Sequence, residues 1–265
     1  MNMYIHELKR YRKSTITWTI SLVLITVLFF SMFPAFSENA GQMQEMFKGF
    51  PDEVLKALGL STLDLSSILG FYAYIFSYVV LCGAIQAMNL GLSSVSVEVR
   101  EKTSDFLLAK PITRNEIITS KLLAIITSVL ITNIFYFSTA FFMAMMLSKD
   151  SFSIKIFILI SLSLFLVEII FLALGMLISV LVKKIKSVVP ISLGIVFSFY
   201  IINLFGSAIG DDKFKYVTPF KFFEPEYIIN NGNYEMKFVL IEIIFVAVSV
   251  FLSYKIYRKK DINAF

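Results

Sequence analysis

The sequence contains little of the chemistry that most enzymes need. Its 265 residues include one cysteine, Cys82, and one histidine, His6. A single cysteine excludes an intrachain disulfide and a cysteine-based metal site, and a single histidine excludes both an HExxH-type zinc site and a serine-histidine triad within the membrane. No glycine is followed by lysine, so these residues lack the Gly-x4-Gly-Lys-Ser/Thr loop that cradles nucleotide phosphates.

Apolar residues dominate the chain. They make up 57% of it, 28 of them are phenylalanine, charged residues account for 16%, and the mean hydropathy is +0.79. Soluble domains are about 45–50% apolar, so the composition predicts an all-α polytopic membrane protein. The net charge of +5 does not indicate nucleic acid here, because the lysines and arginines flank apolar runs and act as topology signals.

Six apolar segments are long enough to cross a bilayer as helices, forming a single transmembrane domain of residues 1–265. The segments lie at about 16–36, 67–92, 114–147, 152–182, 187–206 and 236–257. Residues 1–13 precede them and mix apolar with basic side chains, which predicts a separate interfacial helix on the membrane surface.

Small and polar residues interrupt the second span. Gly83, Ala87 and Gly91 recur every four residues and predict a smooth ridge against which another helix can pack closely. Gln86 and Asn89 lie near this ridge, where buried amides either bond across helices or line a path.

Two carboxylates fall within later spans. Glu168 is near the middle of the fourth span, and Glu242 is near the outer end of the sixth. A mid-span carboxylate is costly and is expected to face protein or water. Glu168 is either a proton, cation or substrate contact, or a structural group that bonds to a neighbouring helix or stays neutral in apolar surroundings. We favour the structural interpretation.

A charged island, residues 95–113, separates the second and third spans. Its first part suits a short amphipathic helix, which Lys110-Pro111 ends because the residue before proline is pushed out of the α region. Thr113 then provides an N-cap with Glu116 as its capping-box partner, so a new helix begins at about Arg114 and continues into the third span.

This order of helix, proline and capped helix resembles the cytoplasmic segment between the second and third membrane helices of type-2 ABC transporter permeases. The resemblance rests on an acidic-basic run, a leucine pair, a proline, a Thr-Arg pair and a lysine: Glu98 to Lys102, Leu107-Leu108, Pro111, Thr113-Arg114 and Lys121. Many members have Gly-Thr where this chain has Thr103-Ser104.

The resemblance implies that the island is a coupling helix that docks on an ATPase subunit. An apolar cluster would enter a cleft on the ATPase, and charged residues would surround it. The apolar members are Phe106, Leu107 and Leu108, and the polar rim is Glu98, Arg100, Glu101 and Asp105. Thr113, Arg114 and Glu116 would fix the start of the third span.

The resemblance also extends to a loop and to the transport path. Residues 207–235 combine aromatic residues, prolines and charges, as do the family's re-entrant loops at the outer mouth of the pathway. In the family the second and fifth helices wall the path, which points to Gln86, Asn89 and Asn203 as lining residues.

Positive charge predicts the topology. Lysine and arginine gather in residues 1–13, 100–121, 183–186 and 255–260, and are about half as frequent in the other loops. Such residues concentrate on the cytoplasmic side, so both termini and the island are expected in the cytoplasm and the protein in the cell membrane.

The leading functional hypothesis is therefore the permease subunit of an ABC transporter. It would itself bind no cofactor and no nucleic acid, and would work within membrane lipid. ATP and Mg²⁺ would bind to two copies of a separate ATPase, and the permease would pair with an identical or related one. The absence of a large soluble binding domain favours export of peptides, drugs or other amphipathic compounds. The alternatives are an accessory or sensor protein, or a membrane-embedded enzyme, which would need catalytic groups less isolated than Glu168 and Glu242.

Overall fold

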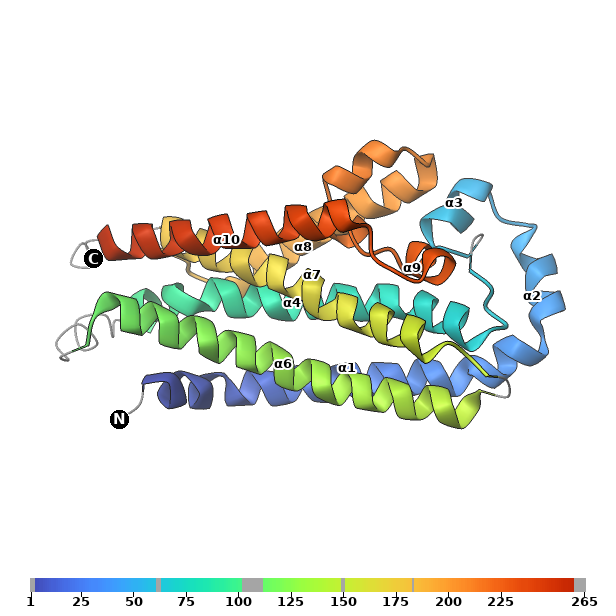
Figure 1. The fold of residues 1–265 in the computed structure, drawn as a ribbon, viewed down its shortest axis with the longest axis horizontal. Helices are drawn as coiled ribbons and strands as arrows, with labels where there is room; N and C mark the ends of the chain where they lie inside the picture. The colour runs from blue at the N-terminus through green and yellow to red at the C-terminus, as the bar shows by residue number, and fades with distance from the viewer. Residues whose placement is uncertain (1–2, 61–62, 102–111, 149–150, 183, 260–265) are drawn as a thin grey trace.

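The protein is a bundle of long helices with short helices gathered at one end (Figure 1). A computed structural model describes residues 3–60, 63–101, 112–148, 151–182 and 184–259. Within these residues every regular element is helical, and six helices are long and apolar enough to cross a membrane. They are α1 (Met3–Glu38), α4 (Ile68–Glu101), α6 (Arg114–Leu147), α7 (Ile154–Leu181), α8 (Val188–Ile209) and α10 (Met236–Lys259). The predicted all-α polytopic fold is confirmed.

The long helices run side by side and define two ends of the bundle (Figure 1). The first turn of α1 and the last turn of α10 lie at one end, which we call the terminal end, together with the last turn of α4 and the first turn of α6. The short helices α2 (Ala40–Phe47), α3 (Asp52–Ala57) and α9 (Pro225–Asn231) lie at the opposite end, the loop end.

The first span differs from the prediction. Residues 3–13 are not a separate interfacial helix but the first turns of α1, which continues without a break into the membrane segment. Glu7 and Tyr11 are buried on the same face as the deeper residues Leu22 and Phe30. Packing of this face against α6, along the whole length of α1 (Figure 1), outweighs any preference of the basic residues for a lipid surface.

The second span also extends further than predicted. The island was expected to start a separate helix at residue 95, but α4 runs through to Glu101. No proline or glycine interrupts residues 92–101, and Val95 and Val97 remain buried, so the packed face of the helix simply continues. The rest of the predicted coupling helix, residues 102–111, lies outside the described part of the chain.

The loop end is built from short helices and aromatic side chains. The short helix α3 follows Pro51 and has Asp52 and Glu53 in its first turn. The loop between α8 and α10 forms η1 (Asp212–Tyr216), η2 (Pro219–Lys221) and α9. Phe220, Phe222 and Phe223 are buried, and the Tyr234 hydroxyl donates to the Leu159 carbonyl of α7 over 2.6 Å. This loop therefore folds back onto the ends of the long helices.

Glycines allow α4 and α7 to pack more closely than any side chain would permit. A Cβ at Gly91 of α4 would lie 2.9 Å from the Met176 nitrogen, and one at Gly175 of α7 would lie 2.9 Å from both the Leu92 nitrogen and the Met88 oxygen. The ridge predicted in the second span is thus confirmed, and its partner is Gly175. Close backbone approach of this kind is a principal source of helix association in lipid.

This contact predicts an asymmetry between two helical glycines. Gly175→Val should push α4 and α7 apart and destabilise the protein by about 1–3 kcal/mol, as overpacking does elsewhere. Gly194→Val in α8 is the matched control, because nothing lies within 4 Å of a Cβ there. The midpoint of thermal unfolding of each variant is measured by size exclusion in mild detergent. Equal midpoints for the two variants would contradict the assigned contact.

Candidate functional site

Two cavities lie beside α4 and α8, the second and fifth spans. The loop-end cavity has a volume of about 370 Å³ and is lined by α3, α4, α8, the η1 and η2 turns, and α9. The terminal-end cavity has a volume of about 510 Å³ and lies between α1, α4 and the start of α8. The two cavities occupy opposite ends of the same pair of helices.

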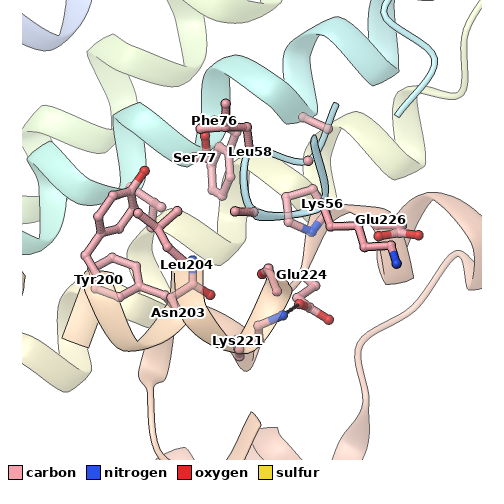
Figure 2. A pocket seen from close by; sticks show the side chains of 18 of the residues that line it. Lys56, Leu58, Phe76, Ser77, Tyr200, Asn203, Leu204, Lys221, Glu224 and Glu226 are labelled. Carbon is pink, nitrogen blue, oxygen red and sulfur yellow. Dashed lines mark hydrogen bonds and ion pairs between the residues drawn. The ribbon is translucent and has the colours of Figure 1, made fainter. Parts of the chain in front are cut away.

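Aromatic and charged side chains both line the loop-end cavity (Figure 2). The aromatic ones include Phe76 of α4 and Tyr200 of α8. Figure 2 also shows Lys221 joined to Glu224, and Glu226 near Lys56. The Lys221 ammonium lies 2.7 Å from a Glu224 carboxylate oxygen, so part of this charge is neutralised within the wall. The cavity therefore offers both apolar and ionic contacts.

The structure separates the three predicted lining residues. Asn203 lines the loop-end cavity. Asn89 lines the terminal-end cavity, and its side-chain oxygen accepts a hydrogen bond from Ser192 of α8 over 2.9 Å. Gln86 lines neither cavity: it is fully buried and donates to the Thr132 hydroxyl of α6 over 2.8 Å. Of the two roles open to Gln86, the structure shows the bond across helices.

Further polar groups connect the spans within the apolar core. The Tyr72 hydroxyl of α4 lies 2.8 Å from the Tyr136 hydroxyl of α6 and 2.7 Å from the Ser161 hydroxyl of α7. The Thr132 hydroxyl also lies 3.0 Å from that of Thr19 in α1. Within lipid no water is available to these polar groups, so such hydrogen bonds satisfy them. The bonds also fix the relative rotation of the helices.

Glu168 is enclosed between three helices. Its carboxylate accepts a hydrogen bond from the Asn133 amide of α6. A Cβ at Gly83 of α4 would lie 2.6 Å from its Oε1, and this oxygen has no hydrogen-bond partner among the described residues. Glu168 borders neither the loop-end cavity nor the terminal-end cavity. Glu242 is likewise buried, in α10.

The start of α6 has the predicted cap. The Thr113 side chain accepts from the Glu116 backbone over 3.2 Å, and the Glu116 carboxylate accepts from the Thr113 backbone over 2.8 Å. A cap of this kind stabilises a helix start by about 1 kcal/mol. The Arg114 guanidinium donates to the carbonyls of Tyr257 and Arg258 over 3.3 and 3.1 Å, which ties α6 to the last turn of α10.

A buried group of charges lies at the terminal end, and we call it the Lys121 cluster. The Lys121 ammonium of α6 is 2.7 Å from the Glu98 carboxylate of α4 and 3.3 Å from the Glu7 carboxylate of α1. The Lys121 side chain is 0% exposed, Glu7 1% and Glu98 5%. Arg10 completes the cluster at 3.8 Å from Glu7, so two cations face two carboxylates.

One predicted docking residue, Glu98, belongs to this cluster. Glu98 lies inside the bundle and not on the surface where a docking side chain would lie, so we assign it to the Lys121 cluster. Arg100 is exposed. The other predicted contacts with the ATPase, which are the Glu101 side chain, Asp105, Phe106, Leu107 and Leu108, lie outside what the structure describes.

Sequence reasoning did not identify Glu7 or the buried state of Lys121. Glu7 is the only acidic residue among the first 13, and an acid within a basic segment was a usable sign of an ion pair. Its partner was not identifiable, because Lys121 is one of many lysines at this end and follows Glu7 by more than a hundred residues.

Six long apolar helices, joined by polar bonds, define a multi-pass membrane protein. The family model described as "ABC-2 family transporter protein" matches residues 1–262. The chain belongs to this family, and it is the membrane component, or permease, of an ABC transporter. No curated protein matches the chain closely enough to serve as a relative.

The environment of Glu168 predicts how it tolerates substitution. Glu168→Gln keeps an acceptor for Asn133 and should be nearly neutral, whereas Glu168→Leu leaves an amide N–H unpaired and should destabilise by about 1 kcal/mol. Asn133→Leu added to Glu168→Leu should recover part of that loss in a double-mutant cycle of thermal unfolding. If Glu168→Gln unfolds normally but abolishes ATP-driven activity of the complex, Glu168 has a chemical role instead.

Proposed function

We propose that this permease forms the membrane path of an exporter powered by a separate ATPase subunit. The observation that carries the proposal is the family match over residues 1–262, in a sequence without a phosphate-binding loop. ATP and Mg²⁺ would then be bound by two copies of the ATPase. The permease would pair with a second permease, identical or related, and the path would lie between the two.

The two cavities support a path along α4 and α8. They occupy opposite ends of these helices, and α8 is the least buried of the six candidate spans. Much of its apolar surface, including Phe197, Ile201 and Phe205, is therefore free to face lipid or a second permease. The aromatic and charged residues that line the loop-end cavity suit an amphipathic molecule, which favours peptides, drugs or other amphipathic compounds as substrates.

The terminal end would face the cytoplasm. Basic residues gather there, and the ends of α4 and α6 that flank residues 102–111 lie at this end (Figure 1). An ATPase docked at this end would move the flanking helices directly. ATP-driven closure of the two ATPase subunits would then open the path on one side and close it on the other.

The orientation can be tested with single cysteines in a Cys82→Ser background. Asn39→Cys and Asn231→Cys at the loop end should react with an impermeant maleimide on intact cells, and Lys184→Cys at the other end should not. All three side chains are exposed in the isolated chain, so accessibility depends on the side of the membrane. Labelling of Lys184→Cys in sealed cells would contradict the orientation.

The docking of the ATPase can be tested on the island. Phe106→Ala combined with Leu107→Ala should weaken binding of the ATPase, because truncating buried apolar anchors costs about 2 kcal/mol or more. Glu101→Ala is the matched control, since a rim charge contributes much less. For each variant, binding of the ATPase is measured by pull-down from mild detergent, and ATP hydrolysis is measured on the recovered complex. Normal binding and hydrolysis by the double variant would remove the docking role from this segment.

A further inference from the structure

The Lys121 cluster is the most completely buried group of opposite charges among the described residues. Its three central side chains come from three different helices: Glu7 from α1, Glu98 from α4 and Lys121 from α6. A charge at such a position is tolerated only when partners surround it. Lys121, at 0% exposed, therefore holds its two carboxylate partners at fixed positions.

Glu98 depends on Lys121 for a second reason. It lies in the last turn of α4, where the helix dipole presents negative partial charge and disfavours a carboxylate. The Lys121 ammonium at 2.7 Å offsets this unfavourable position. The ion pair therefore holds the last turn of α4 next to Lys121 of α6.

The cluster joins the two helices that flank the island. Glu98 lies three residues before Glu101, the last residue of α4, and Lys121 lies two turns into α6, which begins at Arg114. Their ion pair thus connects the helix that enters the island to the helix that leaves it. Glu7 adds the start of α1 to the same point.

Other contacts at the start of α6 have the same effect. Arg114 donates to the last carbonyls of α10, and the Thr119 hydroxyl lies 2.8 Å from the Tyr254 hydroxyl of that helix. Ile117, Val95 and Tyr257 belong to a small apolar core that is distinct from the main core of the bundle. The terminal end is therefore a packed unit in its own right, and the Lys121 cluster is its ionic part.

We propose that Lys121 is a positioning residue for energy coupling. Its ion pairs make the flanks of the island and the start of α1 move as one body, so that displacement on the ATPase side reaches the path. This proposal rests on the proposed function, because it requires an ATPase that acts on the terminal end. A cluster that only stabilised the fold would not be needed for transmission once the helices were assembled.

Two sets of substitutions separate these roles. Glu7→Gln, Glu98→Gln and Lys121→Met together remove the three central charges and give the charge-free variant. Arg10 loses Glu7 but its side chain is 23% exposed, so no fully buried charge is left unpaired, which protects folding. Glu98→Lys, Lys121→Glu and Glu7→Gln together restore an ion pair of reversed sign between α4 and α6. Lys255→Met, at an exposed lysine of α10 at the same end, is the matched control.

The experiment measures the accessibility of a cysteine in the loop-end cavity, at the opposite end of the bundle from the substitutions. All variants carry Ser207→Cys, at a residue lining that cavity, in a Cys82→Ser background, and are purified with their ATPase. Maleimide labelling is compared with and without trapping by ATP and vanadate. The parent with only these two reporter changes should show an ATP-dependent change in labelling rate, and so should the Lys255→Met control.

The charge-free variant should assemble and hydrolyse ATP, but its trapping-dependent change in labelling should fall by about fivefold or more, the lower range of coupling between distant sites. The reversed pair should restore most of the change. A full change in the charge-free variant, or its failure to assemble with the ATPase, would overturn the proposal and leave the cluster a purely stabilising element. A parent that binds no ATPase would instead overturn the proposed function.

Discussion

The close contact between α4 and α7 is the constraint on which the rest of the structure depends. Gly91 and Gly175 bring the two backbones together where no side chain fits, and these two helices are the most buried of the candidate spans. Without a hydrophobic driving force between helices in lipid, close packing and hydrogen bonds hold a bundle together. Once α4 is fixed against α7, its other faces are left for α1, α6 and α8.

Polar groups then set how the neighbouring helices meet α4. Gln86 and Tyr72 bond to α6, and Asn89 to α8, so each contact fixes a rotation as well as a distance. Next to α4, Glu168 of α7 accepts a hydrogen bond from Asn133 of α6 and so joins these two helices. Most of these polar residues within the spans thus serve to assemble the bundle. Asn89 and Asn203 differ in that each lines a cavity.

The two ends of the bundle have different chemistry, and this difference fits the roles proposed for them, which are contact with a substrate and contact with an ATPase. At the loop end, aromatic side chains and short helices surround a cavity that is partly apolar and partly charged. At the terminal end, a buried charge cluster and a small separate core join five helices beside the island: α1, α4, α6, α7 and α10. A rigid terminal end suits the transmission of force, and a lined cavity suits contact with a substrate.

The sequence by itself determined the elements whose causes are local. Hydropathy located the six spans, Thr113 and Glu116 located the start of α6, and small residues in the second span predicted a close helix contact. Only the tertiary structure decided what each face meets: that Gly175 is the partner of Gly91, that Lys121 lies between Glu7 and Glu98, and that residues 3–13 continue α1. The reason is physical. Periodicity shows that a helix has an apolar or small-residue face, but the partner of that face depends on how all the helices pack at once, and a buried ion pair forms only between positions that this packing brings together.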